Sequence, residues 1–483
     1  MKQRFSLAIL IGLAYSISAQ SLRYTGCMVD STVYYSVPRV KEQVSRSYQP
    51  SAFSLLKYCP KVKDQRDYQT CVAWATAYAA RTMVEAIRNG WTDNIQITRE
   101  AFSPCFVYAI IKPADAEYCD KGTYIKSALQ TLQTFGAPKY KSLNKSCYYA
   151  IEQKYFDEAK GNKLHHYNRL FDYQYVNTKN EKISAVKKSI SEKRPVVISM
   201  WVPKSFHENA SESWISKSTD SRPNKAENHW HAMCIVAYND SNFNGHGGFL
   251  LMNSWGDDWG DNGFTWISYD DFFIYTREAY EVYMDPIPIL PDPFIQKNDV
   301  SQNIKHELFG LLELQHYSGE MMESKKHVKD GIICYRINER YTPGMRFRIF
   351  LSNYRPAYVY VISSDMLNNV EAVFPPDKLT SAALTYKTNH IAIPDETHCI
   401  QIREEVLPVT NYLCVFYSTE ELDFEKLCIS IKNTKGSIYK KIRSVIGEIM
   451  VAQTDVNTYD NEIRFEATSE KTILPLVIEI QAE

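Results

Sequence analysis

A proline-rich segment, Asp285–Pro293, is the feature that most limits how this chain can fold. Four of its residues are proline. Proline fixes its own φ and lacks a backbone N–H, so the segment cannot continue a helix or a central strand and favours extended geometry. At 483 residues the chain is also too long for one ordinary core. We therefore expect two folded units, 50–285 and 300–483, joined by a linker over 286–299.

The composition is that of a globular protein, and it excludes some partners. Hydrophobic residues make up 45% of the chain and charged residues 23%. The formal net charge of −1 gives no electrostatic reason to expect nucleic acid or an anionic membrane as a partner. No stretch is apolar for the roughly 18 residues that a membrane-spanning helix needs. We therefore predict no nucleic-acid partner and no transmembrane segment.

The amino terminus has the pattern of a secretory signal. Lys2 and Arg4 precede a short apolar run, Phe5–Tyr15, and small residues follow up to Ala19. We expect residues 1–19 to be a signal peptide and the protein to be exported, to a periplasm or the extracellular space.

A short segment, residues 20–49, follows the predicted signal. Its Thr25-Gly26-Cys27 partly matches a lipoprotein processing site. Arg23 and Tyr24 do not fit that pattern, so we do not expect a lipid anchor at Cys27.

The cysteines exclude two kinds of site. There are eleven, an odd number, so one free nucleophile would leave ten that could pair in an oxidising compartment. No Cys-x-x-Cys occurs, so neither a zinc cage nor a thioredoxin-type redox pair is indicated. We predict no metal and no cofactor.

Within the first unit, helices are expected before strands. Residues 70–88 are alanine-rich and free of Gly and Pro, which predicts a helix with Thr70 as N-cap and Cys71 in its first turn. A second helix is expected over 123–135. Short apolar runs bounded by turn residues predict strands at 195–202, 231–238, 249–252 and 264–268.

The second unit alternates apolar and polar residues with a period of two, which is typical of an antiparallel β domain, most simply a sandwich. The runs that carry this pattern start at Gly344, Ala357, Val370, Leu413 and Thr472. Two helices are expected, over 422–430 and 437–450. The fold class is therefore α+β, with a separate β-sandwich-like domain after the first unit.

Four residues of the first unit form the set that thiol catalysis requires: Gln65, Cys71, His231 and Asn253. A cysteine attacks well only as a thiolate, and a nearby imidazolium lowers its pKa. An amide then holds the imidazole in one tautomer. His229 competes with His231 for the role of base, and His231 is preferred because it opens an apolar strand.

These residues resemble the papain-like cysteine peptidases, in particular their bacterial exported branch, over about residues 50–280. The resemblance implies a two-lobed fold with a helical lobe and a β-barrel-like lobe. It makes Cys71 the nucleophile, His231 the base, Asn253 the orienting amide and Gln65 the oxyanion donor. Trp255 would cover the Asn–His hydrogen bond, and Gly122, in Cys119-Asp-Lys-Gly122, would line the substrate cleft.

Three departures from the family pattern matter. Val72 replaces the Trp that usually follows the nucleophile, a change associated with bacterial members. Tyr68 stands where the family commonly has a cysteine, so Cys119 must pair elsewhere or stay free. Residues 20–64 are too few for the long inhibitory propeptide of the cathepsin branch, so the sequence does not show how activity is restrained before export.

The resemblance implies an exported cysteine endopeptidase that acts on peptides or proteins through a Cys-His-Asn acyl-enzyme mechanism. Two alternatives stay open: a catalytically silent binding or scaffold protein, and a transpeptidase or amidase acting on cell-wall peptides. Residues 300–483 more weakly resemble a β domain of uncharacterised role in exported bacterial peptidases, which could bind a protein or a cell surface.

Overall fold

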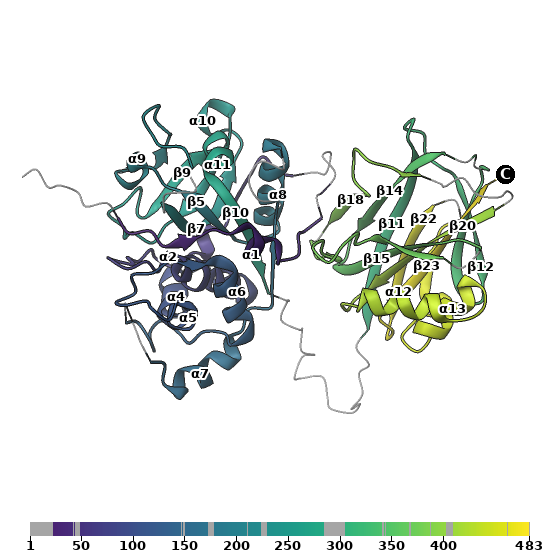
Figure 1. The fold of residues 1–483 in the computed structure, drawn as a ribbon, viewed down its shortest axis with the longest axis horizontal. Coiled ribbons are helices and arrows are strands. Elements are labelled where there is room, and N and C mark those ends of the chain that lie inside the picture. Colours follow the sequence, from purple (N-terminus) through teal and green to yellow (C-terminus); the bar gives the residue numbers. More distant parts are fainter. Residues whose placement is uncertain are drawn as a thin grey trace, which may run out of the picture.

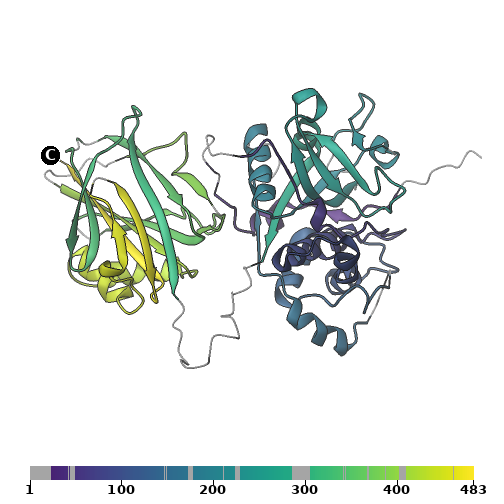
Figure 2. The ribbon, with the colours of Figure 1, turned by 180° about the vertical axis from the view of Figure 1, so that it is seen from behind.

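The computed structural model describes residues 23–482 except 42, 44–48, 146, 148–149, 172–177, 210, 224–228, 285–304, 341, 343, 367–368, 387, 402–408 and 461. The predicted signal peptide (1–19) and linker (286–299) lie outside the described residues. In Figures 1 and 2 the first unit has a helical lobe and a sheet lobe, and the β-rich second unit lies beside them.

The helical lobe is built around one long helix that begins at the predicted nucleophile. It runs as α2 (Cys71–Ala73), the π-helical η2 (Trp74–Arg81) and α3 (Thr82–Asn89). Gly90 ends it in a left-handed conformation with φ of 68°. The lobe also contains η1 (Leu56–Tyr58), α4 (Asn94–Arg99), α5 (Pro104–Ile111), α6 (Ile125–Thr134), α7 (Gln153–Ala159) and η3 (Lys160–Asn162).

The sheet lobe is one eight-stranded sheet in the order β4-β10-β5-β7-β8-β9-β6, with β2 paired to β7. Its strands are β2 (Ala52–Ser54), β4 (His166–Arg169), β5 (Val196–Trp201), β6 (Ser213–Trp214), β7 (Trp230–Asn239), β8 (Gly248–Met252), β9 (Phe264–Ser268) and β10 (Thr276–Tyr283). Four helices accompany them: α8 (Lys179–Ser191), α9 (Lys204–His207), α10 (Asn242–Gly245) and α11 (Tyr269–Tyr275).

The start of the described chain joins the two lobes. Strand β1 (Cys27–Met28) pairs in parallel with β3 (Thr123–Tyr124), and α1 (Ser31–Tyr35) follows. In both views this purple segment runs between the helical lobe and the sheet lobe.

The second unit is a sandwich of two sheets around a shared apolar core. One sheet contains β11 (His306–His316), β14 (Arg346–Asn353), β18 (Asn389–Ile393), β19 (Ile400–Gln401), β21 (Val456–Thr458) and β22 (Ile463–Ser469). The other contains β12 (Ser324–Lys329), β13 (Ile332–Ile337), β15 (Ala357–Ser364), β16 (Val370–Phe374), β17 (Ala383–Leu384), β20 (Val409–Ser418) and β23 (Ile473–Ala482).

Helices α12 (Phe424–Asn433) and α13 (Ile438–Ile446) pack their apolar faces on the outside of the second sheet, and η4 (Gln453–Asp455) precedes β21. One strand pair, β13 with β23, runs parallel, which departs from the expected antiparallel pattern. The predicted sandwich and its two helices are confirmed.

Most sequence predictions for the first unit are confirmed within one or two residues, and two details need comment. Thr70 occupies the predicted N-cap position, but its side chain makes no capping bond, and its buried hydroxyl has no hydrogen-bond partner in the described part of the chain. Residues 123 and 124 belong to a strand, so the second predicted helix begins at Ile125. Among the described residues, none forms a helix both long and apolar enough to cross a membrane.

Candidate active site

Cys71 begins the long helix and faces the sheet lobe. Its side chain is fully buried. Burial raises the pKa of the thiol to about 12, while hydrogen bonds from the N–H groups of Ala232, Val72 and Cys71 itself lower it. The bond from Ala232 places the thiol beside the residue that follows His231. With the cleft in this state Cys71 is a thiol and not the thiolate that attack requires.

His231 is the second residue of β7, paired with Met200 of β5 in the middle of the sheet. Its Nε2–H donates to Oδ1 of Asn253 at 2.7 Å. Its Nδ1 is buried and has no hydrogen-bond partner among the described residues. Burial lowers the pKa of the ring to about 3, although the hydrogen bond to Asn253 acts to raise that pKa. The imidazole is therefore neutral here, with one nitrogen left to exchange a proton.

Asn253 and Trp255 hold that ring from two directions. Asn253 follows β8 directly, and its Oδ1 also accepts the N–H of Ser254 at 2.7 Å, which fixes the amide. The indole of Trp255 stacks on His231 with ring centroids 4.4 Å apart and an interplanar angle of 24°. His207, from α9, stacks on Trp255 as well, at 5.0 Å and 17°.

His207 comes from α9, whose residues Ser205, Phe206 and His207 are buried. Phe206 contacts Trp255 and Trp259, with ring centroids 6.0 and 5.1 Å away. The second candidate base, His229, lies against Trp201, with ring centroids 5.1 Å apart. The ring that bonds to Asn253 is that of His231.

Gln65 is held beside this group by Ser254. The Ser254 hydroxyl donates to Oε1 of Gln65 at 2.7 Å, and the Gln65 N–H donates to the Ser254 carbonyl at 2.8 Å. Sequence reasoning missed Ser254. These two bonds orient the Gln65 amide so that Nε2 is the atom available to an acceptor in the cleft.

The amino-terminal segment provides an acceptor for the Nε2–H donor of Gln65. Nε2 of Gln65 donates to the carbonyl of Tyr24 at 3.1 Å and to the carbonyl of Tyr68 at 2.8 Å. The indole N–H of Trp255 donates to the same Tyr24 carbonyl at 3.0 Å. Arg23 donates to the Trp255 carbonyl at 2.6 Å and pairs with Asp258 at 2.9 Å. Residues 23 and 24 are thus bonded directly to Gln65 and Trp255.

Gly26 bonds to both walls of the cleft. Its N–H donates to the carbonyl of Trp230 at 3.3 Å, and its carbonyl accepts the N–H of Thr123 at 2.9 Å. A Cβ at Gly26 would lie 2.5 Å from the carbonyl oxygen of Gln69, and a Cβ at Gly122 would lie 2.8 Å from the Gly26 carbonyl oxygen. Both glycines therefore permit a close approach of the segment to the helical lobe. Gly122 therefore lies directly against this segment.

Cys27 and Asp30 lie further along the same amino-terminal segment and also contact the first unit. Cys27 is fully buried, and burial together with the nearby Cys71 and Glu278 raises the pKa of its thiol well above the usual range. Burial also raises the pKa of Glu278 to about 8, while the N–H of Asp30 bonds to its carboxyl group. Cys71 and His231 are both fully buried, and residues 23–30 lie against the elements that carry them.

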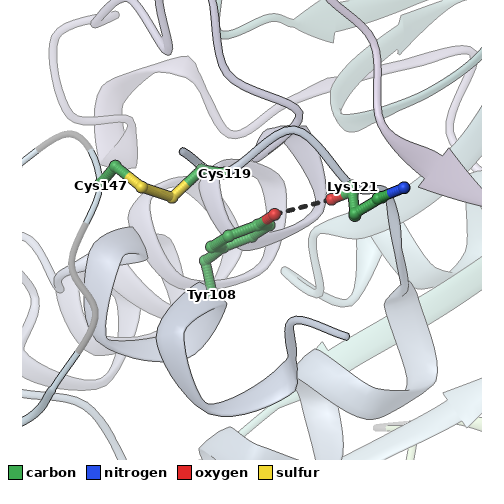
Figure 3. Close-up of a disulfide and its surroundings, with 4 residues drawn as sticks. All are labelled: Tyr108, Cys119, Lys121 and Cys147. Carbon is green, nitrogen blue, oxygen red and sulfur yellow. Dashed lines mark hydrogen bonds between the residues drawn. A yellow bond between two sulfur atoms is a disulfide. The ribbon is translucent and has the colours of Figure 1, made fainter. Parts of the chain in front are cut away.

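A disulfide supports the wall that carries Gly122. Cys119 pairs with Cys147, so the cysteine left without its usual partner pairs elsewhere in the chain. Figure 3 shows this bond next to Tyr108, whose hydroxyl donates to the carbonyl of Lys121 at 2.7 Å. The loop from Cys119 to Gly122 is thereby attached to the helical lobe on both sides of its backbone.

The structure thus brings Gln65, Cys71, His231, Asn253 and Trp255 to one place, with Gly122 beside them. It adds Ser254, His207 and the residues 23–30, none of which the sequence marked as part of the site. Among the described residues no group of three His, Cys, Asp or Glu side chains is placed to hold a metal ion.

Comparison with known proteins gives a family for the first unit. Residues 51–282 match the model described as papain family cysteine protease. Xylellain, a cysteine protease from Xylella fastidiosa, is 17% identical, over 55% of this chain and 97% of its own, with a TM-score of 0.43. Bromelain from Ananas comosus, solved with the E64 inhibitor, is 18% identical, over 49% and 100%, with a TM-score of 0.38. A search of curated protein sequences finds no match.

Proposed function

We propose that this chain is an exported cysteine endopeptidase of the bacterial branch that works through a Cys-His-Asn acyl-enzyme, because residues 51–282 match the model described as papain family cysteine protease. The observation that supports these roles best is the state of His231. Its Nε2 is committed to Asn253, and its Nδ1 is buried and free to take a proton. That is the arrangement a base beside a nucleophilic thiol requires.

In the proposed reaction the Cys71 thiol passes its proton to Nδ1 of His231 and its sulfur attacks the scissile carbonyl. The oxyanion is stabilised by the N–H of Cys71 and by Nε2 of Gln65. The His231 imidazolium then gives the proton to the leaving amine, which departs and leaves a thioester on Cys71. Water, deprotonated by His231, hydrolyses the thioester and restores the thiol. Asn253 keeps the ring in one tautomer throughout.

We further propose that residues 23–30 keep the enzyme latent. A substrate carbonyl would need Nε2 of Gln65, which Tyr24 occupies. A buried, neutral Cys71 thiol is also a weak nucleophile. Export agrees with the Cys119–Cys147 disulfide, since such bonds persist in oxidising compartments.

Hydrolysis of an unstructured fluorogenic peptide tests the proposal. Gly26→Val places a side chain where Gln69 leaves no room, so it should expel the segment and raise hydrolysis above that of the parent protein. Adding Cys71→Ala to that variant should abolish hydrolysis. Hydrolysis that survives Cys71→Ala would refute the assigned mechanism.

The same assay addresses the two alternatives. A silent scaffold protein would release no product in any variant. A transpeptidase would transfer the acyl group to an added amine such as glycine methyl ester, and the aminolysis product would exceed the hydrolysis product. An endopeptidase gives mainly hydrolysis.

A further inference from the structure

The amino-terminal segment that contains the blocking residues 23–30 continues past the cleft. Beyond α1, this blocking segment passes between the peptidase unit and the β domain. The N–H of Val40 donates to the carbonyl of Arg169, in β4, at 3.0 Å, and the N–H of Arg169 donates to the carbonyl of Pro38 at 3.1 Å. On the opposite side, the N–H of Arg39 donates to the carbonyl of Leu379 at 2.5 Å, and its carbonyl accepts the N–H of Ser381 at 2.7 Å.

Residues 38–40 are therefore bonded on one side to the peptidase unit and on the other to the β domain, like a strand in the middle of a sheet. Side chains strengthen both junctions. The Arg169 guanidinium donates to the carbonyl of Val37 at 2.8 Å. The Lys41 ammonium donates to the carbonyl of Pro394, and the side-chain oxygen of Gln43 accepts the N–H of His390 at 2.9 Å.

A second contact joins the two units directly. Tyr386, from the β domain, is 2% exposed and packs with the apolar core of the peptidase unit. Its hydroxyl donates to the carboxylate of Glu281 at 2.9 Å, and Arg194 pairs with the same carboxylate at 3.1 Å. Arg194 also donates to the carbonyl of Thr385. Docking of the β domain thus gives the buried Glu281 carboxylate, in the sheet lobe, a hydrogen-bond donor.

Between cleft and junction the segment is anchored by α1. The Tyr34 ring is fully buried, and its hydroxyl donates to the carbonyl of Phe171 at 2.7 Å. The segment between Cys27, in the cleft, and Arg39, at the junction, is short. Loss of the contacts at one end should therefore weaken the contacts at the other end.

From these contacts we propose that the β domain is a clamp, which keeps residues 23–30 in the active-site cleft by binding residues 38–41 and Gln43 against the peptidase unit. This inference rests on the proposed function and adds its regulation. The coupling is reciprocal: whatever favours docking of the β domain favours the blocked cleft, and whatever separates the domains favours release of the segment.

The junction has the character of a contact that can open. A cavity of about 770 Å³ borders it, and its walls come from all three parts: Val37 of the segment, Tyr167 and Tyr283 of the peptidase unit, and Tyr358 and Thr380 of the β domain. An interface with such a gap lacks the continuous packing of a domain core, and contacts between domains of one chain commonly open and close.

Two full-length variants test the clamp. Tyr386→Ala removes the docking side chain, which packs in the peptidase core and is not part of the sandwich core. Lys41→Met keeps the buried stem but loses the bond to Pro394. Tyr317→Ala is the matched control, because it is also a change from tyrosine to alanine but lies at an exposed position of the β domain. Gly26→Val serves as the positive control for an open cleft.

The readout is the rate at which iodoacetamide alkylates Cys71, followed by mass spectrometry and normalised to the partly exposed Cys399. We expect Tyr386→Ala and Lys41→Met to label Cys71 about tenfold faster than the parent protein, and Tyr317→Ala to match the parent. Peptide hydrolysis should rise in the same order.

Parental labelling rates in both clamp variants, with fast labelling in Gly26→Val, would overturn the clamp and leave the proposed function standing. Parental labelling in Gly26→Val would overturn the clamp too, since the segment would then not be the barrier. Fast labelling in the clamp variants without hydrolysis of any peptide would support the clamp and refute the peptidase function.

Discussion

Gln65, the proposed oxyanion donor, shares two hydrogen bonds with Ser254. We expect Gln65→Ala, made in the Gly26→Val background, to lower kcat by roughly 10²–10³-fold, the size of effect that one oxyanion donor has. The KM for a short peptide should change much less, because the bond strengthens mainly in the transition state. A fall in kcat below about threefold would assign the oxyanion to other donors. Steady-state kinetics on one fluorogenic peptide separates these outcomes.

His231 is oriented by two neighbours, and they do not contribute equally. Asn253→Ala removes the hydrogen bond to Nε2 but leaves the Trp255 indole stacked on the ring. We therefore expect Asn253→Ala to lower kcat less than His231→Ala, which removes the base itself. Equal losses in the two variants would give Asn253 a larger role than orientation.

His207 makes stability depend on pH. Burial, with His229 and Arg23 nearby, lowers its pKa to about 4. Between pH 6.5 and 4 the unfolded chain therefore binds a proton here that the folded chain does not, so stability falls as the pH falls. Relative to His207→Gln, the parent protein should lose stability over this window by at most about 3 kcal/mol.

Denaturant unfolding at pH 7.5 and pH 4.5 measures this difference; it includes the small effect that His207 has on the pKa of the nearby His231. His246→Gln, at an exposed position, is the control and should behave as the parent does. A pH-independent difference between the parent and His207→Gln would show that His207 is not held neutral by the fold.

At the scale of elements, the periodic segments were predictable and the blocking segment was not. The helix from Cys71 to Asn89 and the strands β5, β7, β8 and β9 each have an uninterrupted local pattern that tertiary contacts reinforce. Strand β1 has two residues, and α1 has five. Both elements form because they contact parts of the two lobes that are distant in the sequence. Such long-range contacts leave no periodicity in the sequence.

The disulfide is likewise a long-range feature. Sequence reasoning left Cys119 to pair elsewhere or stay free, and the structure gives Cys147 as its partner. Cys147→Ser should lower the free energy of unfolding by about 3 to 4 kcal/mol, since the two cysteines are 28 residues apart and the bond restricts the unfolded chain.

Denaturant unfolding of the oxidised proteins measures that loss, with Cys399→Ser, a free and partly exposed thiol, as the control. A loss no greater than that of the control would mean that the loop from Cys119 to Gly122 is held by Tyr108 and its other packing alone.

At the scale of the whole molecule, the sequence predicted two units, but it could not predict how they meet. The candidate site residues form an ordered motif along the chain, which is why the sequence could single them out. The contact between domains depends on single residues, such as Tyr386 and Glu281, whose types are ordinary in a core. The independent folding of each unit, their boundaries and any outside partner of the β domain stay predictions.

The most direct test of the central claim is to treat the Gly26→Val protein with an epoxide that traps reactive thiols and to map the adduct by mass spectrometry. We expect one adduct per chain, on Cys71, with peptide hydrolysis lost in proportion to labelling and with labelling much slower in His231→Ala. Full loss of hydrolysis with Cys71 unmodified, or an adduct on another residue that accounts for the loss, would contradict that claim.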